Sequence, residues 1–242
     1  MGLGKRTIAQ DLAERIRTLE SSSRHADARI IPLGTGGLGP LFASEGLPNA
    51  TLIELLTASV GSGALTLALH LAKHACGERK TLVVADHQRS FYPLALARLG
   101  IDVSRVIVLR CPNPRDTLAG LVQALRCPAV GAVVGQFDAI AVPEFRRLQL
   151  AAETHGGIGL FLRPESARGG TSFAGVRWDV RPLRSVDACR RLHIDILRER
   201  GDGIALRQRD RAAIVEIDDA TGAVRLFSAL GHSTAATRNV GG

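Results

Sequence analysis

Lysines, aromatic residues and long apolar runs are scarce in this chain of 242 residues. Lys5, Lys73 and Lys80 are the only lysines, so arginine supplies 28 of the 31 basic residues, and aromatic residues make up 4% of the sequence. No stretch approaches the ~18 to 20 continuous apolar residues of a membrane span, and no charged segment followed by an apolar run suggests secretion. We therefore expect no membrane association and a cytoplasmic location.

Cysteine motifs are also absent. The four cysteines are Cys76, Cys111, Cys127 and Cys189. They include no CxxC pair and no Cys/His set at zinc-ligand spacing, so we expect free thiols that are mostly buried. His70 and His74 stand four residues apart in a predicted helix, but no third ligand accompanies them. We therefore assign this pair to a helix face and predict neither a metal nor a cofactor.

The chain is basic and has enough apolar residues for a core. Hydrophobic residues make up 45% of the sequence, charged residues 22%, and the formal net charge is +8. This profile predicts one globular core domain. The positive charge favours an acidic partner or nucleic acid.

The N-terminal region predicts a separate helix. In residues 1–24, apolar side chains recur at helical spacing with charged residues on the other faces. These apolar residues are Ile8, Leu12, Ile16 and Leu19. A polar run follows, and we interpret residues 25–46 as a linker. The helix then docks separately or binds a partner.

Residues 47–230 predict an α/β core domain, and residues 231–242 a disordered tail. Short apolar runs alternate with helical patterns, which is typical of a parallel sheet covered on both faces. The predicted strands are 51–56, 81–86, 105–109, 132–137 and 158–162, and the predicted helices are 64–76, 91–99, 115–125 and 143–154. Four strands without helices follow, at 176–183, 191–198, 212–217 and 223–227. They predict antiparallel edge strands, the last two joined as a hairpin at Thr221-Gly222.

The turn after the first core strand has the form of a phosphate-binding loop. Residues 57–66 read TASVGSGALT, with glycines that would let backbone N–H groups surround a phosphate. Ala64 and Leu65 stand where such loops need a lysine and a metal-binding hydroxyl. Gly61, Ser62 and Gly63 are therefore candidates for a vestigial anion site. The alternative is that the loop persists because the fold needs a tight turn there.

Three segments resemble the RecA recombinase core. Residues 86–102, DHQRSFYPLALARLGID, are similar to the RecA stretch DAEHALDPIYARKLGVD. Residues 164–170, PESARGG, are similar to PETTTGG of the RecA DNA-binding loop, and residues 176–181, VRWDVR, to VRLDIR. The resemblance spans roughly residues 47 to 200 and implies a RecA-like twisted sheet that is mainly parallel.

The departures from RecA imply loss of catalysis. Gln88 stands where RecA has a catalytic glutamate, and an amide cannot accept a proton from water. Tyr92 and Ala95 stand opposite the RecA residues that contact adenine. Residues 132–137 lack the Walker B aspartate, and Asp138 beyond them is interpreted as a cap or turn residue.

A RecA-like chain with these losses resembles the ImuA family. The segments FRRLQLAAE at 145–153, RLHIDILR at 191–198 and DDATG at 218–222 fit that family. The resemblance implies a non-catalytic accessory protein of translesion synthesis that binds ImuB, RecA or both. RecA subunits associate through an N-terminal helix, so residues 1–24 are expected to pack on another subunit or on RecA. A RecA-type DNA-dependent ATPase and a SulA-like inhibitor of cell division stay open as alternatives.

Arginines concentrate in the C-terminal part of the chain. Residues 163–211 contain twelve arginines and seven acidic residues. Four arginines flank or lie within the segment that resembles the RecA DNA loop, namely Arg163, Arg168, Arg177 and Arg181. Along one rim they would follow a phosphate backbone and give weak, salt-sensitive binding to single-stranded DNA. A solvated basic face or a face for an acidic protein is the alternative.

Overall fold

The structure is a computed structural model that describes residues 29–34, 37–42, 44–59, 61–186, 189–199 and 212–230. The predicted N-terminal helix with Ile8, Leu12, Ile16 and Leu19 lies outside the described residues, as does the predicted tail at 231–242. Both therefore stay predictions.

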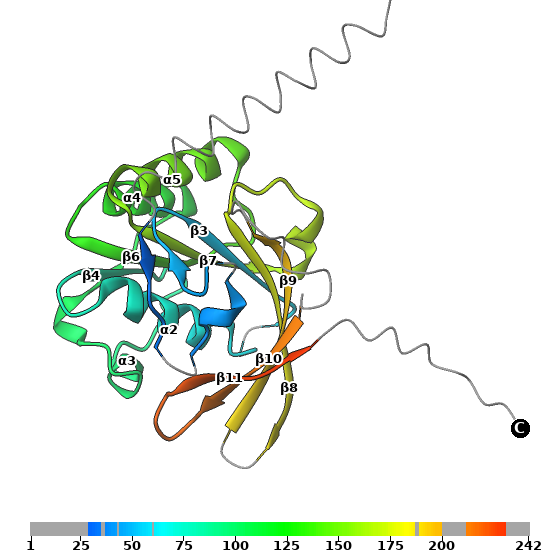
Figure 1. The fold of residues 1–242 in the computed structure, drawn as a ribbon. Coiled ribbons are helices and arrows are strands. Elements are labelled where there is room, and N and C mark those ends of the chain that lie inside the picture. Colours follow the sequence, from blue (N-terminus) through cyan, green and yellow to red (C-terminus); the bar gives the residue numbers. More distant parts are fainter. Residues whose placement is uncertain are drawn as a thin grey trace, which may run out of the picture.

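One nine-stranded sheet organises the described chain (Figure 1). Its order is β11-β10-β9-β8-β3-β7-β6-β4-β5. The strands are β3 (Leu52–Thr57), β4 (Thr81–Ala85), β5 (Val106–Leu109), β6 (Val130–Gln136), β7 (Ile158–Pro164), β8 (Val176–Val186), β9 (Cys189–Glu199), β10 (Ala212–Asp218) and β11 (Val224–Leu230). Pairing is parallel from β8 through β3 to β5, and antiparallel from β8 to β11. The predicted mainly parallel sheet with antiparallel C-terminal strands is confirmed.

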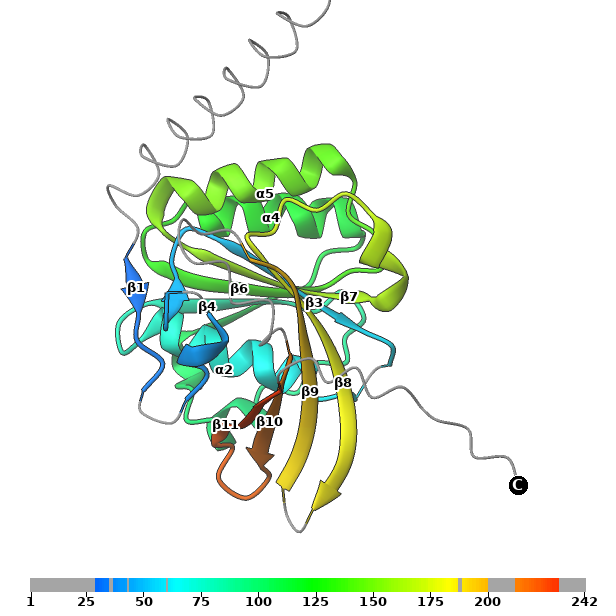
Figure 2. The same cartoon turned by 45° about the vertical axis from the view of Figure 1, so that its right-hand side comes forward.

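Helices cover the parallel strands on both faces. Helix α2 (Ala64–Cys76) lies on one side of the sheet, and α4 (Pro114–Leu125) and α5 (Val142–His155) lie on the other (Figure 2). Local sequence fixes their ends. Asn113 caps α4 by accepting a hydrogen bond of 2.8 Å from the Asp116 N–H, and Gly156 ends α5 in the left-handed region at φ 75°.

The segment before α3 is less helical than predicted. Helix α3 spans Ala95–Arg98, whereas the sequence predicted a helix over 91–99. The carboxylate of Asp86 accepts hydrogen bonds from the N–H groups of Ser90 and Phe91, which holds the chain in a turn before the helix begins. Three short 3₁₀ turns complete the fold: η1 (Gly39–Leu41), η2 (Val103–Arg105) and η3 (Glu165–Gly169). No helix of the described residues is long and apolar enough to cross a membrane.

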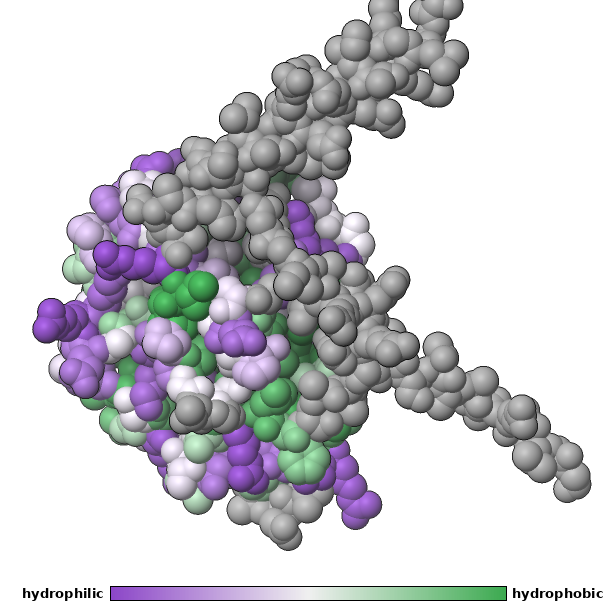
Figure 3. Space-filling view, in the orientation of Figure 1, coloured by the Kyte–Doolittle hydropathy of each residue, from purple (hydrophilic) through white to green (hydrophobic). Residues whose placement is uncertain are grey.

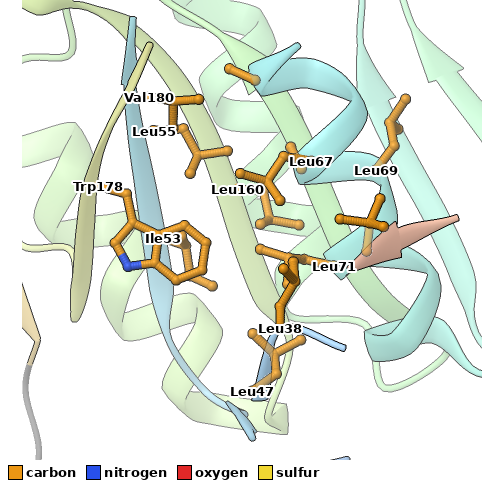
Figure 4. Packing of buried hydrophobic residues seen from close by; sticks show 14 of the residues in the cluster. Leu38, Leu47, Ile53, Leu55, Leu67, Leu69, Leu71, Leu160, Trp178 and Val180 are labelled. Carbon is orange, nitrogen blue, oxygen red and sulfur yellow. The ribbon is translucent and has the colours of Figure 1, made fainter. Parts of the chain in front are cut away.

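The core has two layers, one on each face of the sheet. The layer under α2 includes Ile53, Leu55, Leu160 and Trp178, all fully buried (Figure 4). The second layer packs α4 and α5 on the opposite face around Phe145 and other buried residues. Strands β3 and β7 are buried on both faces, which explains their nearly continuous apolar sequences.

The predicted linker is wrong for its described part, because residues in 30–46 belong to the core. β1 (Ile30–Ile31) pairs with β2 (Leu47–Pro48), and Leu38 is fully buried. The Phe42 ring lies 5.0 Å from the Trp178 ring, centroid to centroid. The apolar residues of this segment fill the core from turns and short strands. They therefore lack the helical or alternating period that sequence analysis detects.

Candidate functional site

The predicted phosphate loop forms a tight turn between β3 and α2. Gly61 and Gly63 have φ values of 82° and 91°, a region that favours glycine, and Gly63 is the N-cap of α2. Ser62 is buried, and its Oγ accepts a hydrogen bond of 3.4 Å from the Ala64 N–H. The structure thus brings the three candidate residues together in the predicted strand-to-helix turn.

A leucine from β9 packs against this loop. A Cβ added to Gly63 would lie 2.9 Å from Cδ2 of Leu192. Leu65, which stands at the position of the metal-binding hydroxyl, is 40% exposed. No side chain of residues 61–66 carries a charge. The loop therefore retains its turn but lacks the side chains that neutralise a nucleotide's terminal phosphates.

Asp86, at the carboxyl end of β4, is fully engaged within the fold. Besides the N–H groups of Ser90 and Phe91, it accepts a hydrogen bond of 3.0 Å from Nε of Arg110. Burial raises the pKa of Asp86, but these hydrogen bonds outweigh burial and leave its pKa below the ordinary value. Gln88 beyond it is exposed. Asp138 is an exposed residue in a bend, while Ala141 occupies the N-cap of α5, so Asp138 is a turn residue.

Two of the four candidate DNA-binding arginines are buried against Glu54. Glu54 lies on β3 and is fully buried. Arg163 on β7 donates a hydrogen bond of 2.7 Å to Glu54, and Arg177 on β8 donates to the other carboxylate oxygen. Arg177 also donates to the carbonyls of Ala167 and Arg168. We call Glu54, Arg163 and Arg177 the Glu54 triad.

The other two candidates share one buried carboxylate. Asp179 on β8 is 1% exposed, and Arg168 and Arg181 donate to it over 3.0 and 2.6 Å. The side chains of both arginines stay about half exposed. Hydrogen bonding to Asp179 raises the pKa of Arg181. We call these residues the Asp179 triad.

Sequence analysis missed a third group of the same kind. Glu216 on β10 is 3% exposed, and Arg191 on β9 and Arg225 on β11 are its direct cross-strand neighbours. Both arginines donate to it over 2.7 to 2.9 Å, which lowers the pKa of Glu216. An acidic residue inside an otherwise apolar strand was the available sign, both here and at Glu54.

These contacts correct the predicted DNA rim. Arg163 and Arg177 are buried and both paired with Glu54, so they cannot follow a phosphate backbone. Arg168 and Arg181 lie together on the surface and retain N–H groups for a further acceptor. Half of the predicted rim is thus a structural ion triad, and the other half remains a candidate contact surface.

The histidine pair and the cysteines show no metal site. The rings of His70 and His74 lie 4.9 Å apart on α2, and no group of metal-ligating side chains occurs within the described residues. Burial, followed by the nearby charges of His74 and Lys73, lowers the pKa of His70 to about 4. The cysteines are free thiols, but Cys127 is exposed and the other three are half-buried, less buried than predicted.

The chain is similar to known proteins in sequence and in fold. No family model matches the chain. The chain is 27% identical over 172 residues to Protein ImuA of Caulobacter vibrioides, covering 64% of this chain and 70% of that protein. It is 25% identical over 142 residues to Protein RecA of Bifidobacterium breve, covering 59% of this chain and 36% of that protein. The crystal structure of the RadB recombinase matches the fold with a TM-score of 0.59 at 16% identity, covering 79% of this chain and 98% of that chain.

Proposed function

We propose that the chain is an ImuA-like, RecA-like protein with an accessory role in damage-induced mutagenesis, and that it performs this role without hydrolysing ATP. The main support for this proposal is the sequence and structure of the phosphate loop. Ala64 and Leu65 replace the lysine and the hydroxyl, and Leu192 packs against Gly63.

Electrostatics explains why these replacements matter. Phosphoryl transfer is accelerated mainly by positive charge placed at the terminal phosphates and by the bound magnesium ion. A loop with Ala64 and Leu65 at these two positions supplies neither the charge nor the hydroxyl ligand for the metal. Gln88 adds a second loss, since an amide cannot act as the base that activates water.

Measurement of ATP turnover, with and without single-stranded DNA, tests the proposal. We expect turnover at the level of a protein-free control, with an active RecA-type enzyme as the positive control. DNA-stimulated turnover comparable to that enzyme, lost in Gly63→Val, would overturn the proposed absence of hydrolysis.

We further propose that the accessory role works through binding of ImuB, RecA or both by residues 1–24, with self-association through the same helix. Support comes from the similarity to Protein ImuA and from the predicted apolar face of Ile8, Leu12, Ile16 and Leu19. Pull-downs with ImuB and RecA separately should lose a partner when residues 1–24 are deleted, and sedimentation should show smaller assemblies.

A matched pair of variants separates the apolar face from the helix as a whole. Leu12→Ala with Ile16→Ala should weaken binding, whereas Glu14→Ala with Arg17→Ala on the other faces should not. Unchanged binding of both partners after the deletion would exclude this segment.

Weak binding of single-stranded DNA by Arg168 and Arg181 is the remaining part of the proposal. Fluorescence anisotropy should show an affinity that falls with salt, with a slope of roughly 0.7 per phosphate contact. Arg168→Ala with Arg181→Ala should reduce both the affinity and the slope. Arg105→Ala should not, since this half-buried arginine on η2 lies outside the candidate surface and pairs with Asp102. Equal binding of DNA by the double variant would contradict this part of the proposal and favour an acidic protein as the partner of the basic face.

A further inference from the structure

Tyr92 and Leu94 are the most exposed large apolar side chains in the described part of the chain. Tyr92 is 65% exposed and Leu94 is 61% exposed. They lie two residues apart between β4 and α3, and Tyr92 is the only tyrosine of the sequence. Figure 3 shows hydrophobic residues in separate patches among hydrophilic ones on the face that carries α2 and α3. An exposed tyrosine and an exposed leucine two residues apart need a reason, because neighbouring exposed apolar residues mark interaction sites and tyrosine is enriched in binding hot spots.

Three contacts fix the backbone that carries the two side chains. Asp86 accepts hydrogen bonds from the N–H groups of Ser90 and Phe91 on the N-terminal side. On the other side Leu96 is fully buried. The turn between β10 and β11 packs against α3 so closely that a Cβ added to Gly222 would lie 2.7 Å from the Arg98 carbonyl oxygen. We call residues 89–98 the Tyr92 platform.

Because the backbone of the Tyr92 platform is already ordered, binding a partner there costs less conformational entropy. A partner that docks on it does not have to order the backbone, so more of the contact energy appears as affinity. The mobile alternative, a loop that orders on contact, would bind more weakly for the same area.

The charge around the platform is positive. Arg89 and Arg98 are exposed and make no side-chain hydrogen bond or ion pair with the described residues. No acidic residue occurs from 87 to 101. The nearest turn holds Asp218, which accepts hydrogen bonds from its own turn, and Asp219, which pairs with Arg190. Neither residues 87–101 nor the turn with Asp218 and Asp219 therefore offers an unpaired carboxylate to offset the positive charge of the two arginines.

We propose that the Tyr92 platform docks an acidic peptide segment of a partner protein, with apolar side chains seated on Tyr92 and Leu94 and carboxylates facing Arg89 and Arg98. The proposal rests on the accessory role proposed above, to which it adds the chemistry of a partner. A single-stranded nucleic acid fits less well, because stacking successive bases requires more than one ring and Leu94 offers none. A symmetric contact with a second copy would bring the free arginines of both copies together.

Selection from a displayed library of random dodecapeptides on the full chain tests the proposal. We expect enrichment of peptides that combine Asp or Glu with Leu, Phe or Trp. Tyr92→Ala with Leu94→Ala should weaken their binding by on the order of tenfold or more. Arg89→Gln with Arg98→Gln should flatten the salt dependence of the affinity.

The matched control is Val142→Ala with Leu150→Ala on the exposed side of α5, where two apolar residues are about half exposed. It should bind the selected peptides like the parent, and all variants should keep the parent's urea midpoint. Enrichment of peptides without acidic residues, or equal binding by the Tyr92/Leu94 variant, would overturn the proposal. So would displacement of the peptides by oligo-dT or loss of a dimer in that variant. ATP turnover would overturn the proposed absence of hydrolysis and leave this inference intact.

Discussion

The two halves of the sheet are stabilised by different means. In the parallel half, from β3 to β5, helices cover both faces and most side chains between the layers are apolar. In the antiparallel half, from β8 to β11, one face of the sheet is apolar and contributes to the core layer under α2. The other face carries carboxylates that are each hydrogen-bonded to two arginines. The Glu54 triad lies at the boundary and joins β7, β3 and β8.

This difference accounts for six of the 28 arginines. Glu54, Asp179 and Glu216 each bind two arginines, so six arginines are used in pairs on buried carboxylates. Arginine suits this use, because its planar group can bond to several acceptors at once and is less strongly hydrated than the ammonium group of lysine. A large local excess of arginine is therefore weak grounds for nucleic-acid binding in this fold.

Removing the central carboxylate should have the largest effect. Glu54→Gln leaves Arg163 and Arg177 buried without a counter-charge, and breaking a buried pair in this way costs about 3 to 5 kcal/mol. Urea unfolding followed by circular dichroism measures the change in the free energy of unfolding.

The control replaces the triad as a whole. Glu54→Met with Arg163→Leu and Arg177→Met removes all three charges and should recover most of the lost stability. Because Arg177 also holds the carbonyls of Ala167 and Arg168, faster hydrogen exchange is expected at residues 165–170 in the triple variant. A neutral effect of Glu54→Gln would show that the triad is not a structural element.

An apolar substitution probes the parallel half. Leu160 on β7 is fully buried in the layer under α2. Leu160→Ala should cost about 2 to 5 kcal/mol, since it removes buried methyl groups and leaves a cavity. The loss should be independent of salt, because the substitution removes packing contacts and no charge. Urea unfolding at low and high salt measures the change in the free energy of unfolding.

Periodicity predicted most of the sheet and helices, because the apolar residues of these elements recur at regular spacing. Helix α2 has the predicted bounds, and each core strand lies at its predicted place. Residues 30–46 were missed because Leu38 and Phe42 reach the core from turns, where no period exists. The helix at 91–99 was overestimated because the side chain of Asp86, remote from the helical pattern, bonds to the backbone of Ser90 and Phe91.

The candidate site was predicted in part. The glycines of the loop indicated its turn correctly, since a positive φ is a local requirement. The contact between Gly63 and Leu192 joins residues far apart in the sequence and leaves no local trace. The same holds for Arg163 and Arg177, whose charge suggested a surface although their partner Glu54 is buried on another strand.

Acid should weaken the fold in two pH ranges. His70 on α2 has an ordinary pKa of 6.5 that is lowered to about 4 in the fold, so the unfolded chain binds the extra proton as pH falls from 6.5 to about 4. Stability is therefore lost in that range, by no more than about 3 kcal/mol. The pKa of Glu216 is also lowered, so its contribution is lost only below the ordinary pKa of 4.5.

The variant His70→Gln separates the two ranges. It should flatten the stability curve from pH 6.5 to 4.5 and leave the decline at lower pH unchanged, as measured by the urea midpoint at each pH. Parallel curves for the parent and His70→Gln would mean that His70 is protonated equally in both states.

Arg168 and Arg181, the exposed arginines of the Asp179 triad, should contribute least to stability. Arg168 is 46% exposed and donates one hydrogen bond to Asp179, which also binds Arg181. Exposed pairs of this kind are worth about 0 to 1 kcal/mol, because water competes for both partners and the long side chain loses freedom. Arg168→Ala should therefore shift the free energy of unfolding by no more than about 1 kcal/mol, and less at high salt. Arg163→Ala, which leaves Glu54 with one partner in a buried setting, should cost several times more. Equal losses in the two variants would mean that the exposed arginines contribute as much to stability as the buried ones. That outcome would contradict the argument that Arg168 and Arg181 can bind a second acceptor.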